Sequence, residues 1–192
     1  MEEIEIVSVS NEDINDILTI QSQNHIKNVE SVDFWFLVHE MDRAYLDELI
    51  QSKTSLIEIA KIHDHVVGYL VAYDLDRQDK EWRDSISFHK DFDQMLLHTN
   101  KILYAKHIAI KKWFASKWIG TILEDHCFQK ARDQWYTHIL WEIAQSINKD
   151  GKKVKNDFSM KYHRKKWFDE IGELTYTAGA EKEFRSLIVL KL

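Results

Sequence analysis

The sequence lacks several features that mark particular classes of protein. Its 192 residues include a single cysteine, Cys127, which excludes an intramolecular disulfide framework and fits a reducing compartment. The longest uncharged apolar run near the middle of the chain, residues 66–73, is far too short to cross a membrane. The acidic start MEEIEIVSV also lacks the basic residues that open a signal peptide. We therefore expect a cytoplasmic protein that has no membrane partner.

Repeats, low-complexity tracts and linkers are absent as well, so nothing in the sequence demands a second domain. Hydrophobic residues make up 44% of the chain and charged residues 30%, which is typical of a folded globular protein. A chain of this length buries roughly 70% of the surface that its unfolded form exposes. We interpret residues 1–192 as one domain.

The net charge of -6 argues against a dedicated nucleic-acid-binding protein, but the charges are unevenly spread. Residues 149–166 contain eight Lys or Arg and two Asp, so this segment carries +6 and the rest of the chain -12. An anionic ligand fits such a segment. A solvated helix face with its turn explains the same lysines equally well.

Hydrophobic periodicity predicts an α/β (α+β) fold with a central mixed, twisted sheet of about seven strands flanked by helices. The segment 75–100 is polar and aromatic without a clear period, and we interpret it as a helical insertion. The residues 63–65 form a tight hairpin turn in this interpretation. Strands are predicted at 4–9, 55–62, 66–73, 102–110, 137–143, 171–176 and 184–190, and helices from residue 14, within 34–51 at least from Arg43, at 119–132 and at 158–168.

The chain has no proline and only five glycines, yet Gly120 lies where the strand at 102–110 turns into the helix at 119–132. A strand that leads directly into a helix presents unpaired backbone N–H groups and the positive end of the helix dipole. A glycine there lets a pyrophosphate approach the main chain closely. An ordinary strand-turn-helix connection is the alternative. Three nearby lysines add positive charge: Lys111, Lys112 and Lys117.

The segments HIAI at 107–110 and ASKWIG at 115–120 resemble the GNAT N-acetyltransferase superfamily. There a strand ending in a pattern like hLAV leads into a [QR]xxGx[GA] turn that grips the pyrophosphate of coenzyme A. Ala115 stands here in place of Gln or Arg, Trp118 in place of the first glycine, and only Gly120 is retained. The resemblance implies a GNAT-like acyl-CoA N-acyltransferase fold with acetyl-CoA as co-substrate. The implied contacts are the main chain of Ile108 and Ile110, together with Ser116, Lys117, Trp118, Ile119, Gly120 and Thr121.

A second stretch, residues 156–168, is similar to the superfamily pattern NxxAxxxYxxxGF. The residues in register with it are Asn156, Ser159, His163, Trp167 and Phe168. The resemblance implies that Asn156 contacts the cofactor arm, with Asn148 as a rival, and that His163 protonates the departing thiolate. Tyr162, one residue away, competes for that acid role. His107 is the candidate base for the acceptor amine, because the unperturbed pKa of histidine lies near neutrality.

The resemblance implies an enzyme that transfers an acetyl group from acetyl-CoA to an amine by direct attack. The acceptor is a small-molecule or peptide amine, expected to bind between residues 33–50 and 75–100, and the chain could form a homodimer. Tryptophan at two glycine positions of the superfamily suggests an alternative, a noncatalytic interaction protein of the same fold. The basic segment 149–166 suggests a further alternative, an acetyltransferase that acts on charged tRNA.

The remaining expectations concern single residues. We expect Trp118 to be helical, with its ring pointing away from the phosphate. We expect Trp167 to adopt a right-handed or extended conformation and to pack its ring against the sheet. His63 and His65 flank a predicted turn and are expected to be exposed, so no metal site is expected. Cys127 lies on the apolar stripe of its helix and is expected in the core.

Overall fold

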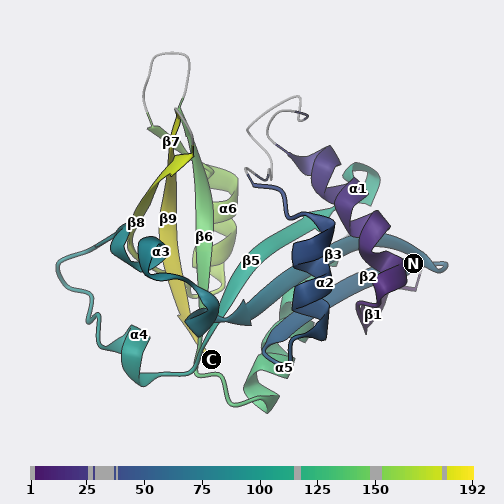
Figure 1. Cartoon of the computed structure of the whole chain (residues 1–192), viewed down its shortest axis with the longest axis horizontal. Coiled ribbons are helices and arrows are strands. Elements are labelled where there is room, and N and C mark those ends of the chain that lie inside the picture. Colours follow the sequence, from purple (N-terminus) through teal and green to yellow (C-terminus); the bar gives the residue numbers. More distant parts are fainter. Residues whose placement is uncertain are drawn as a thin grey trace.

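The computed structural model describes residues 3–25, 28, 37, 39–114, 118–147, 153–178 and 181–192. Within them nine strands form a mixed sheet with helices on both faces (Figure 1). The strands are β1 (Glu5–Ser8), β2 (Ser55–Ile62), β3 (His65–Asp74), β4 (Ile86–Phe88), β5 (Ile102–Ile110), β6 (His138–Ile147), β7 (Lys153–Lys155), β8 (Asp169–Ala178) and β9 (Glu181–Lys191). The helices are α1 (Ile14–Asn24), α2 (Arg43–Gln51), α3 (Lys80–Asp84), α4 (Leu96–Thr99), α5 (Ile119–Asp133) and α6 (Asp157–Lys165), with 3-10 turns η1 (Asn11–Asp13), η2 (Leu75–Arg77) and η3 (Lys112–Phe114). None of the described helices is long and apolar enough to cross a membrane.

The strand order is β1-β2-β3-β5-β6-β9-β8-β4, and β7 pairs with β6. Among the described strand pairs, β5 and β6 alone run parallel, and the others are antiparallel. The predicted mixed sheet flanked by helices is confirmed, but it has nine strands instead of about seven. The additional strands, β4 and β7, have three residues each, which is too short for a hydrophobic period to show in the sequence.

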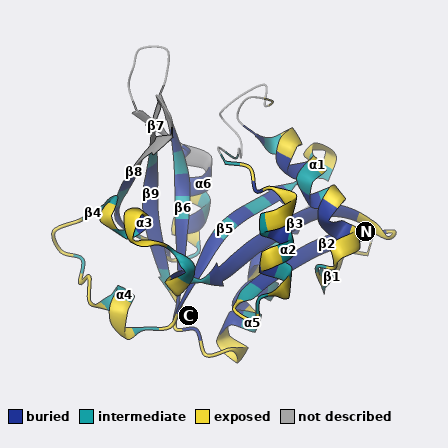
Figure 2. Ribbon diagram, in the orientation of Figure 1, coloured by how far each residue is buried: buried dark blue, intermediate teal, exposed yellow. Residues whose placement is uncertain are grey.

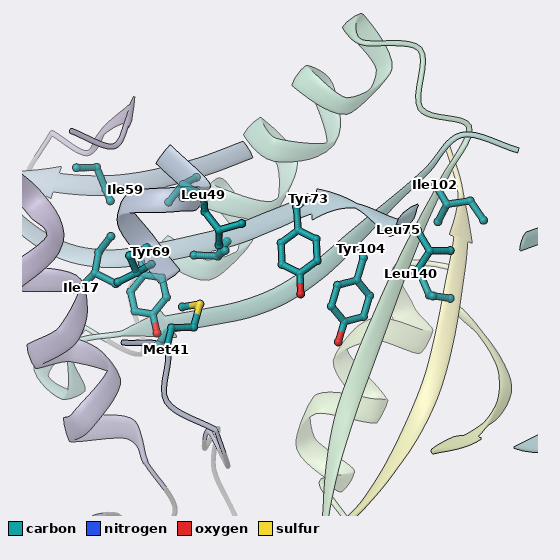
Figure 3. Packing of buried hydrophobic residues seen from close by; sticks show 14 of the residues in the cluster. Ile17, Met41, Leu49, Ile59, Tyr69, Tyr73, Leu75, Ile102, Tyr104 and Leu140 are labelled. Atoms are coloured by element: carbon teal, nitrogen blue, oxygen red, sulfur yellow. The ribbon is translucent and has the colours of Figure 1, made fainter. Parts of the chain in front are cut away.

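The strands in the middle of the sheet are buried on both faces (Figure 2). In β3 every residue from 66 to 73 is buried. Alternate residues of this strand serve two cores, because successive side chains point to opposite faces. Tyr69 and Tyr73 pack on the face covered by α1 and α2 (Figure 3), while Leu70 and Ala72 pack on the face covered by α5. Burying a side chain such as Leu stabilises the fold by roughly 1.5–3 kcal/mol.

Two connections test the sequence interpretation. The β2–β3 hairpin turns at His63 and Asp64, which both have positive φ angles (47° and 65°), as a two-residue turn requires. The predicted tight turn is therefore confirmed, with His65 as the first residue of β3. The helical interpretation of the segment 75–100 is only partly right. Besides η2, α3 and α4, the segment contains strand β4, which extends the sheet by pairing with β8.

Candidate active site

Strands β5 and β6 pair only over the first part of β5. The parallel pairing covers Ile102 to Ala105, although β5 continues to Ile110. Lys106 is bulged, because Ala105 and His107 on either side of it pair with consecutive residues of β3. A bulge bends a strand and increases its twist. Beyond Ala105 the two strands therefore separate, as Figure 1 shows.

The main chain of β5 faces this separation at two residues that the sequence predicted. The N–H of Lys111 donates to the carbonyl of Val67 on β3 at 2.8 Å. In an antiparallel ladder the backbone groups of alternate residues point to opposite sides of the strand. Ile108 and Ile110 are out of phase with Lys111, so their backbone groups point away from β3 and toward the gap beside β6. At the outer end of the gap, the carbonyl of Ile110 accepts from Asn24 Nδ2 at 3.1 Å.

Helix α5 begins beside the same part of β5. Its N-cap is Trp118, whose side chain makes no capping hydrogen bond, and the N–H of Ile122 donates to the Trp118 carbonyl at 3.0 Å. The N–H groups of residues 119–121 have no acceptor within the helix. If Gly120 carried a Cβ atom, the described atom beyond its own helix that this Cβ would contact within 4 Å is Ile108 Cδ1, at 3.7 Å. No other described atom beyond its own helix crowds Gly120.

The conformation of this turn corrects one expectation. Trp118 is left-handed (φ 62°, ψ 7°) instead of helical, so the tryptophan and not Gly120 makes the sharp change of direction. The ring nevertheless lies mostly in solvent, since 76% of Trp118 is exposed. Ser116 and Lys117, two of the predicted cofactor contacts, lie outside the described residues. So does Ala115, which stands in place of the Gln or Arg of the superfamily pattern.

His107 is buried in β5, opposite Val71 of β3, and therefore lies on the sheet face that α1 and α2 cover. Its Nδ1 atom has no hydrogen-bond partner in the described part of the chain. Burial, followed by the nearby charges of Lys106, Arg185 and His39, holds the pKa of His107 well below its ordinary value of 6.5. The imidazole is thus neutral at physiological pH, and the same burial makes it a weaker base than a solvated histidine.

Tyr162 on α6 reaches the start of α5. Its hydroxyl lies 2.9 Å from Thr121 Oγ1 and donates to Glu124 Oε2 at 2.8 Å. The ring is half-buried, and burial together with the Glu124 carboxylate raises the pKa of Tyr162 to about 12. The phenol is therefore protonated at physiological pH, and it contacts Thr121, the residue after Gly120.

His163, the residue in register with the superfamily tyrosine, lies deeper. It is 1% exposed and its ring packs against Trp141 and Phe168, at centroid distances of 4.9 and 5.1 Å. Its Nδ1 donates to the Ser159 carbonyl at 2.8 Å, and burial lowers its pKa to about 4. The acid roles of Tyr162 and His163 both stay predictions, and Tyr162 is the less buried of the two.

Asn156 is buried at the N-cap of α6, where its side-chain oxygen accepts from the N–H of Ser159 at 3.0 Å. Its own N–H donates to the Ala144 carbonyl of β6 at 3.2 Å. The asparagine thus fixes the start of α6 against the sheet, and its contact with a cofactor arm stays a prediction. The rival Asn148 lies outside the described residues.

The expectation for Trp167 is wrong. Its backbone is left-handed (φ 68°) and 84% of the residue is exposed, so the ring does not pack against the sheet. The tryptophan adopts the conformation that glycine takes after a helix end, and α6 therefore stops at Lys165 instead of continuing to Phe168. Neither Trp167 nor Trp118 fills the gap between β5 and β6, since both indoles face solvent.

The sequence interpretation missed a buried carboxylate on the same sheet face as His107. Glu142 in β6 accepts hydrogen bonds from Tyr104 Oη and, at 2.7 Å, from Trp82 Nε1. Burial raises the pKa of Glu142, but the charges of Lys106 and Arg185 outweigh it, so its pKa lies below the ordinary value. The sequence signal for the buried Glu142 was a charged residue in the middle of the apolar strand HILWEIAQSI.

Other candidate features lie apart from this region. A groove of about 920 Å³ lies between α1 and η3, with Ser22, Lys112 and Trp113 in its lining. The described residues contain no group of three His, Cys, Asp or Glu side chains that could hold a metal ion. Cys127 is buried, as expected, and burial raises the pKa of its thiol.

Comparison with known proteins supplies the last observation. No protein-family model and no curated protein matches the chain. Solved structures do match it. The ribosomal-protein-S18-alanine N-acetyltransferase from Escherichia coli has a TM-score of 0.66 at 11% identity, over 98% of this chain and 94% of that one.

Two structures from Arabidopsis thaliana are similar over their full length. NAA60 in complex with acetyl-CoA has a TM-score of 0.68 at 9% identity, over 99% of both chains. Naa50 in complex with the bisubstrate analogue CoA-Ac-MVNAL has a TM-score of 0.63 at 11% identity, over 98% of this chain and 99% of that one. The resemblance in sequence and the likeness in structure agree: this chain has the fold of the GNAT N-acetyltransferases.

Proposed function

We propose that the chain is a GNAT-type N-acetyltransferase that moves the acetyl group of acetyl-CoA to an amine by direct attack. The observation that carries this proposal is the separation of the parallel strands β5 and β6 after Ala105, beside the uncapped start of α5. The likeness to proteins solved with acetyl-CoA and with a bisubstrate analogue supports the choice of co-substrate.

The residues at the gap fit acetyl-CoA, which supplies an activated thioester when it is bound. The N–H groups of residues 118–121 and the helix dipole would hold its pyrophosphate, and Gly120 leaves room for it. The main chain of Ile108 and Ile110 would hold the arm that follows, because their backbone groups face the gap. The predicted contacts of Ser116, Lys117 and Asn156 belong to the same proposal.

Two side chains carry the proton transfers in this proposal. His107 removes a proton from the acceptor amine as the new C–N bond forms; it is neutral, and its Nδ1 has no hydrogen-bond partner among the described residues. Tyr162 or His163 donates a proton to the sulfur as the C–S bond breaks. Neither step forms a covalent bond to the enzyme.

The acceptor is the amine of a peptide or of a small molecule. Support comes from the Naa50 structure, whose bisubstrate analogue carries the peptide MVNAL. His107 points to the sheet face that α1 and α2 cover, so the acceptor would approach from that side. The segment 75–100 borders the same face, since Trp82 contacts Glu142 there. The other predicted border is residues 33–50, of which 33–36 and 38 lie outside the described residues, while Met41 and the α2 residues Leu46 and Leu49 pack on the same face.

Calorimetric titration with acetyl-CoA tests the proposal. The parent chain should bind acetyl-CoA, and Gly120→Asp should abolish binding because it places a side chain and a negative charge over the phosphate position. The variant should still fold, because an acidic residue in the first turn of a helix is favourable. Gln129→Asp adds the same charge on the exposed face further along α5 and should bind like the parent. Equal affinity of Gly120→Asp and the parent would refute the site.

A noncatalytic interaction protein of the same fold is the alternative, favoured by the exposed indoles of Trp118 and Trp167. Exposed apolar side chains on a soluble domain can mark a binding surface. The same titration separates the two functions: a parent chain that binds neither acetyl-CoA nor coenzyme A at millimolar concentration would support the interaction protein.

A further inference from the structure

A bulge places two consecutive polar residues on the face of the sheet where we propose that the acceptor binds. Successive side chains of a regular strand point to opposite faces, so Tyr104 and His107, which are three residues apart, should face opposite ways. Both nevertheless lie on the face that α1 and α2 cover, because Lys106 between them is bulged. The side chain of Lys106 lies on that face too, since its Nζ is 5.8 Å from the centroid of the Tyr104 ring. Bulges next to active sites often re-aim a side chain in this way.

Lys106 is one of two cations around a single carboxylate on this face. The side chain of Glu142 in β6 is 4% exposed, and it accepts a hydrogen bond from Tyr104 Oη. Arg185 of β9 is 8% exposed, and its Nε lies 3.6 Å from Glu142 Oε2. Burial acts to raise the pKa of Glu142, but the charges of Lys106 and Arg185 hold it below its ordinary value. The cluster of Lys106, Glu142 and Arg185 therefore has one positive charge in excess.

The excess positive charge reaches His107. After burial itself, the two cations of the cluster and then His39 lower the pKa of its imidazole. A carboxylate lies near the same face, because burial and then the charge of Glu40 raise the pKa of Tyr69, the diagonal neighbour of His107. Glu40 is exposed, however, so solvent screens its charge, whereas charges inside the fold are screened much less. An ammonium group beside His107 would therefore meet net repulsion.

This repulsion bears on which amines can react. Attack on the thioester needs the lone pair of the nitrogen, so an ammonium group must first lose its proton. The α-amine of a peptide has an ordinary pKa of about 8, and an alkylamine such as a lysine side chain has one of about 10.4. At pH 7 a peptide α-amine is therefore neutral about 300-fold more often. His107 does little to offset this difference, because burial makes it a weak base.

We infer that Lys106 is a specificity-determining residue, which together with Arg185 repels alkylammonium groups from the reacting position, so that the acceptor is the weakly basic α-amine of a peptide. The inference rests on the proposed function and names the acceptor class of the same site. Polyamines, which carry several ammonium groups, are the acceptors that this charge excludes most strongly. The acceptor amine is neutral when it binds, and its proton has already passed to solvent.

The first test measures proton release and needs no turnover. The peptide MVNAL with a free α-amine is titrated calorimetrically at pH 7 into the full chain saturated with coenzyme A, in two buffers that differ in their enthalpy of ionisation. Because the free peptide is mostly protonated and the bound amine is neutral, binding to the parent should release close to one proton. Lys106→Met should release fewer, whereas Lys106→Arg keeps the charge and should match the parent. Binding to the parent without release of a proton would overturn the inference.

The second test compares acceptors by turnover. Release of coenzyme A from acetyl-CoA is measured with MVNAL, with an N-terminally acetylated peptide of the same length that contains one lysine, and with spermidine. At pH 7 the parent should have a kcat/KM for MVNAL at least about 100-fold above that for the other two. In Lys106→Met this preference should fall about tenfold, and the acid limb of kcat with MVNAL should move to higher pH, because loss of a nearby positive charge raises the pKa of the bound amine and of His107.

Controls separate specificity from a damaged fold. Lys53→Met removes a lysine that is exposed before β2 and should behave like the parent. In Lys106→Met the carboxylate of Glu142 keeps its hydrogen bonds from Tyr104 and Trp82, so the variant should fold and bind acetyl-CoA with the Kd of the parent. Lys106→Gln, which removes the charge but keeps a polar side chain, is the second variant and should show the same loss of preference.

The inference and the proposed function fail in distinguishable ways. A parent chain that binds neither acetyl-CoA nor coenzyme A would refute the proposed function, and the inference with it. A parent chain that binds acetyl-CoA and acetylates spermidine or the lysine peptide as fast as MVNAL would refute the acceptor class alone. An unchanged preference for MVNAL in both Lys106→Met and Lys106→Gln would overturn the role of Lys106.

Discussion

Tyr69 and His107 lie on the same face of the sheet, on the neighbouring strands β3 and β5. Tyr69 is the partner of Ala109, two residues after His107, so the two rings are diagonal neighbours. Each buries a polar atom, Tyr69 Oη and His107 Nδ1, that has no hydrogen-bond partner among the described residues. Such a group costs about 1–3 kcal/mol of stability. The fold thus keeps two destabilising groups side by side where we propose that the acceptor binds.

Removing the unpaired hydroxyl should stabilise the fold. We expect Tyr69→Phe to raise the free energy of unfolding by about 1 kcal/mol, because the variant no longer buries an unsatisfied polar atom. Tyr104→Phe is the matched control on the same face. It should lower the free energy of unfolding by about 1–3 kcal/mol, because the buried Glu142 loses a donor. Urea unfolding at pH 7 measures both, and equal destabilisation by the two variants would contradict the prediction.

The buried His163 should make the fold sensitive to mild acid. Burial lowers its pKa from 6.5 to about 4, so between these values the unfolded chain binds a proton that the folded chain does not. Stability is therefore fully present above pH 6.5 and is lost as the pH falls toward 4. At about 1.4 kcal/mol per pKa unit, the loss approaches about 3 kcal/mol. His163→Phe should remove the part of this dependence that His163 contributes, while the buried His107 keeps its own. Urea unfolding at pH 7, 6 and 5 that gives the same pH dependence for parent and variant would refute it.

The elements with strong periodicity could be predicted from the sequence. The strand expected at 102–110 and the helix expected at 119–132 correspond to β5 and α5 almost residue for residue. Both elements have long apolar patterns. The strand is buried on both faces of the sheet, and the helix is buried on the side that packs against the sheet. The parallel pairing of β5 with β6 and its early end could not be read from the sequence, since a bulge at Lys106 leaves no mark on composition.

The candidate site was predicted less completely, for two physical reasons. Left-handed tryptophans are strained, so nothing in the sequence favours this conformation at Trp118 or Trp167. Contacts between distant helices are equally hidden: Lys166 and Glu124 are 42 residues apart in the chain, and each alone looks like a surface charge. Register with the superfamily pattern pointed to His163, whereas the packing of α6 on α5 brings Tyr162 to the start of α5.

The strain at Trp167 predicts an unusual gain. A left-handed conformation costs a residue with a side chain roughly 1–2 kcal/mol, whereas glycine adopts it freely. The indole is 84% exposed, so little packing is lost. Trp167→Gly should therefore raise the free energy of unfolding by up to about 1 kcal/mol. Trp113→Gly is the control, because Trp113 is as exposed but lies in η3 with an ordinary φ angle, and glycine there should be destabilising. A loss of stability in Trp167→Gly measured by urea unfolding would contradict the argument.

The last prediction concerns the attachment of the segment 75–100 to the sheet. Trp82 in α3 is buried, and its Nε1 donates to Glu142 at 2.7 Å, while its ring packs edge-on against Tyr104 at a centroid distance of 5.5 Å. Trp82→Phe keeps most of the apolar surface but removes the donor, so the buried carboxylate of Glu142 loses one of its hydrogen bonds.

Because this contact ties α3 to β6, its loss should let the segment 75–100 open locally more often than the rest of the fold. Amide hydrogen exchange at residues 79–99 should therefore accelerate in Trp82→Phe, while exchange in β3 and β5 stays close to that of the parent. Trp113→Phe, at an exposed tryptophan, should leave both regions unchanged. Exchange that accelerates equally across the whole sheet would show that Trp82 supports the core in general, and not the attachment of this segment.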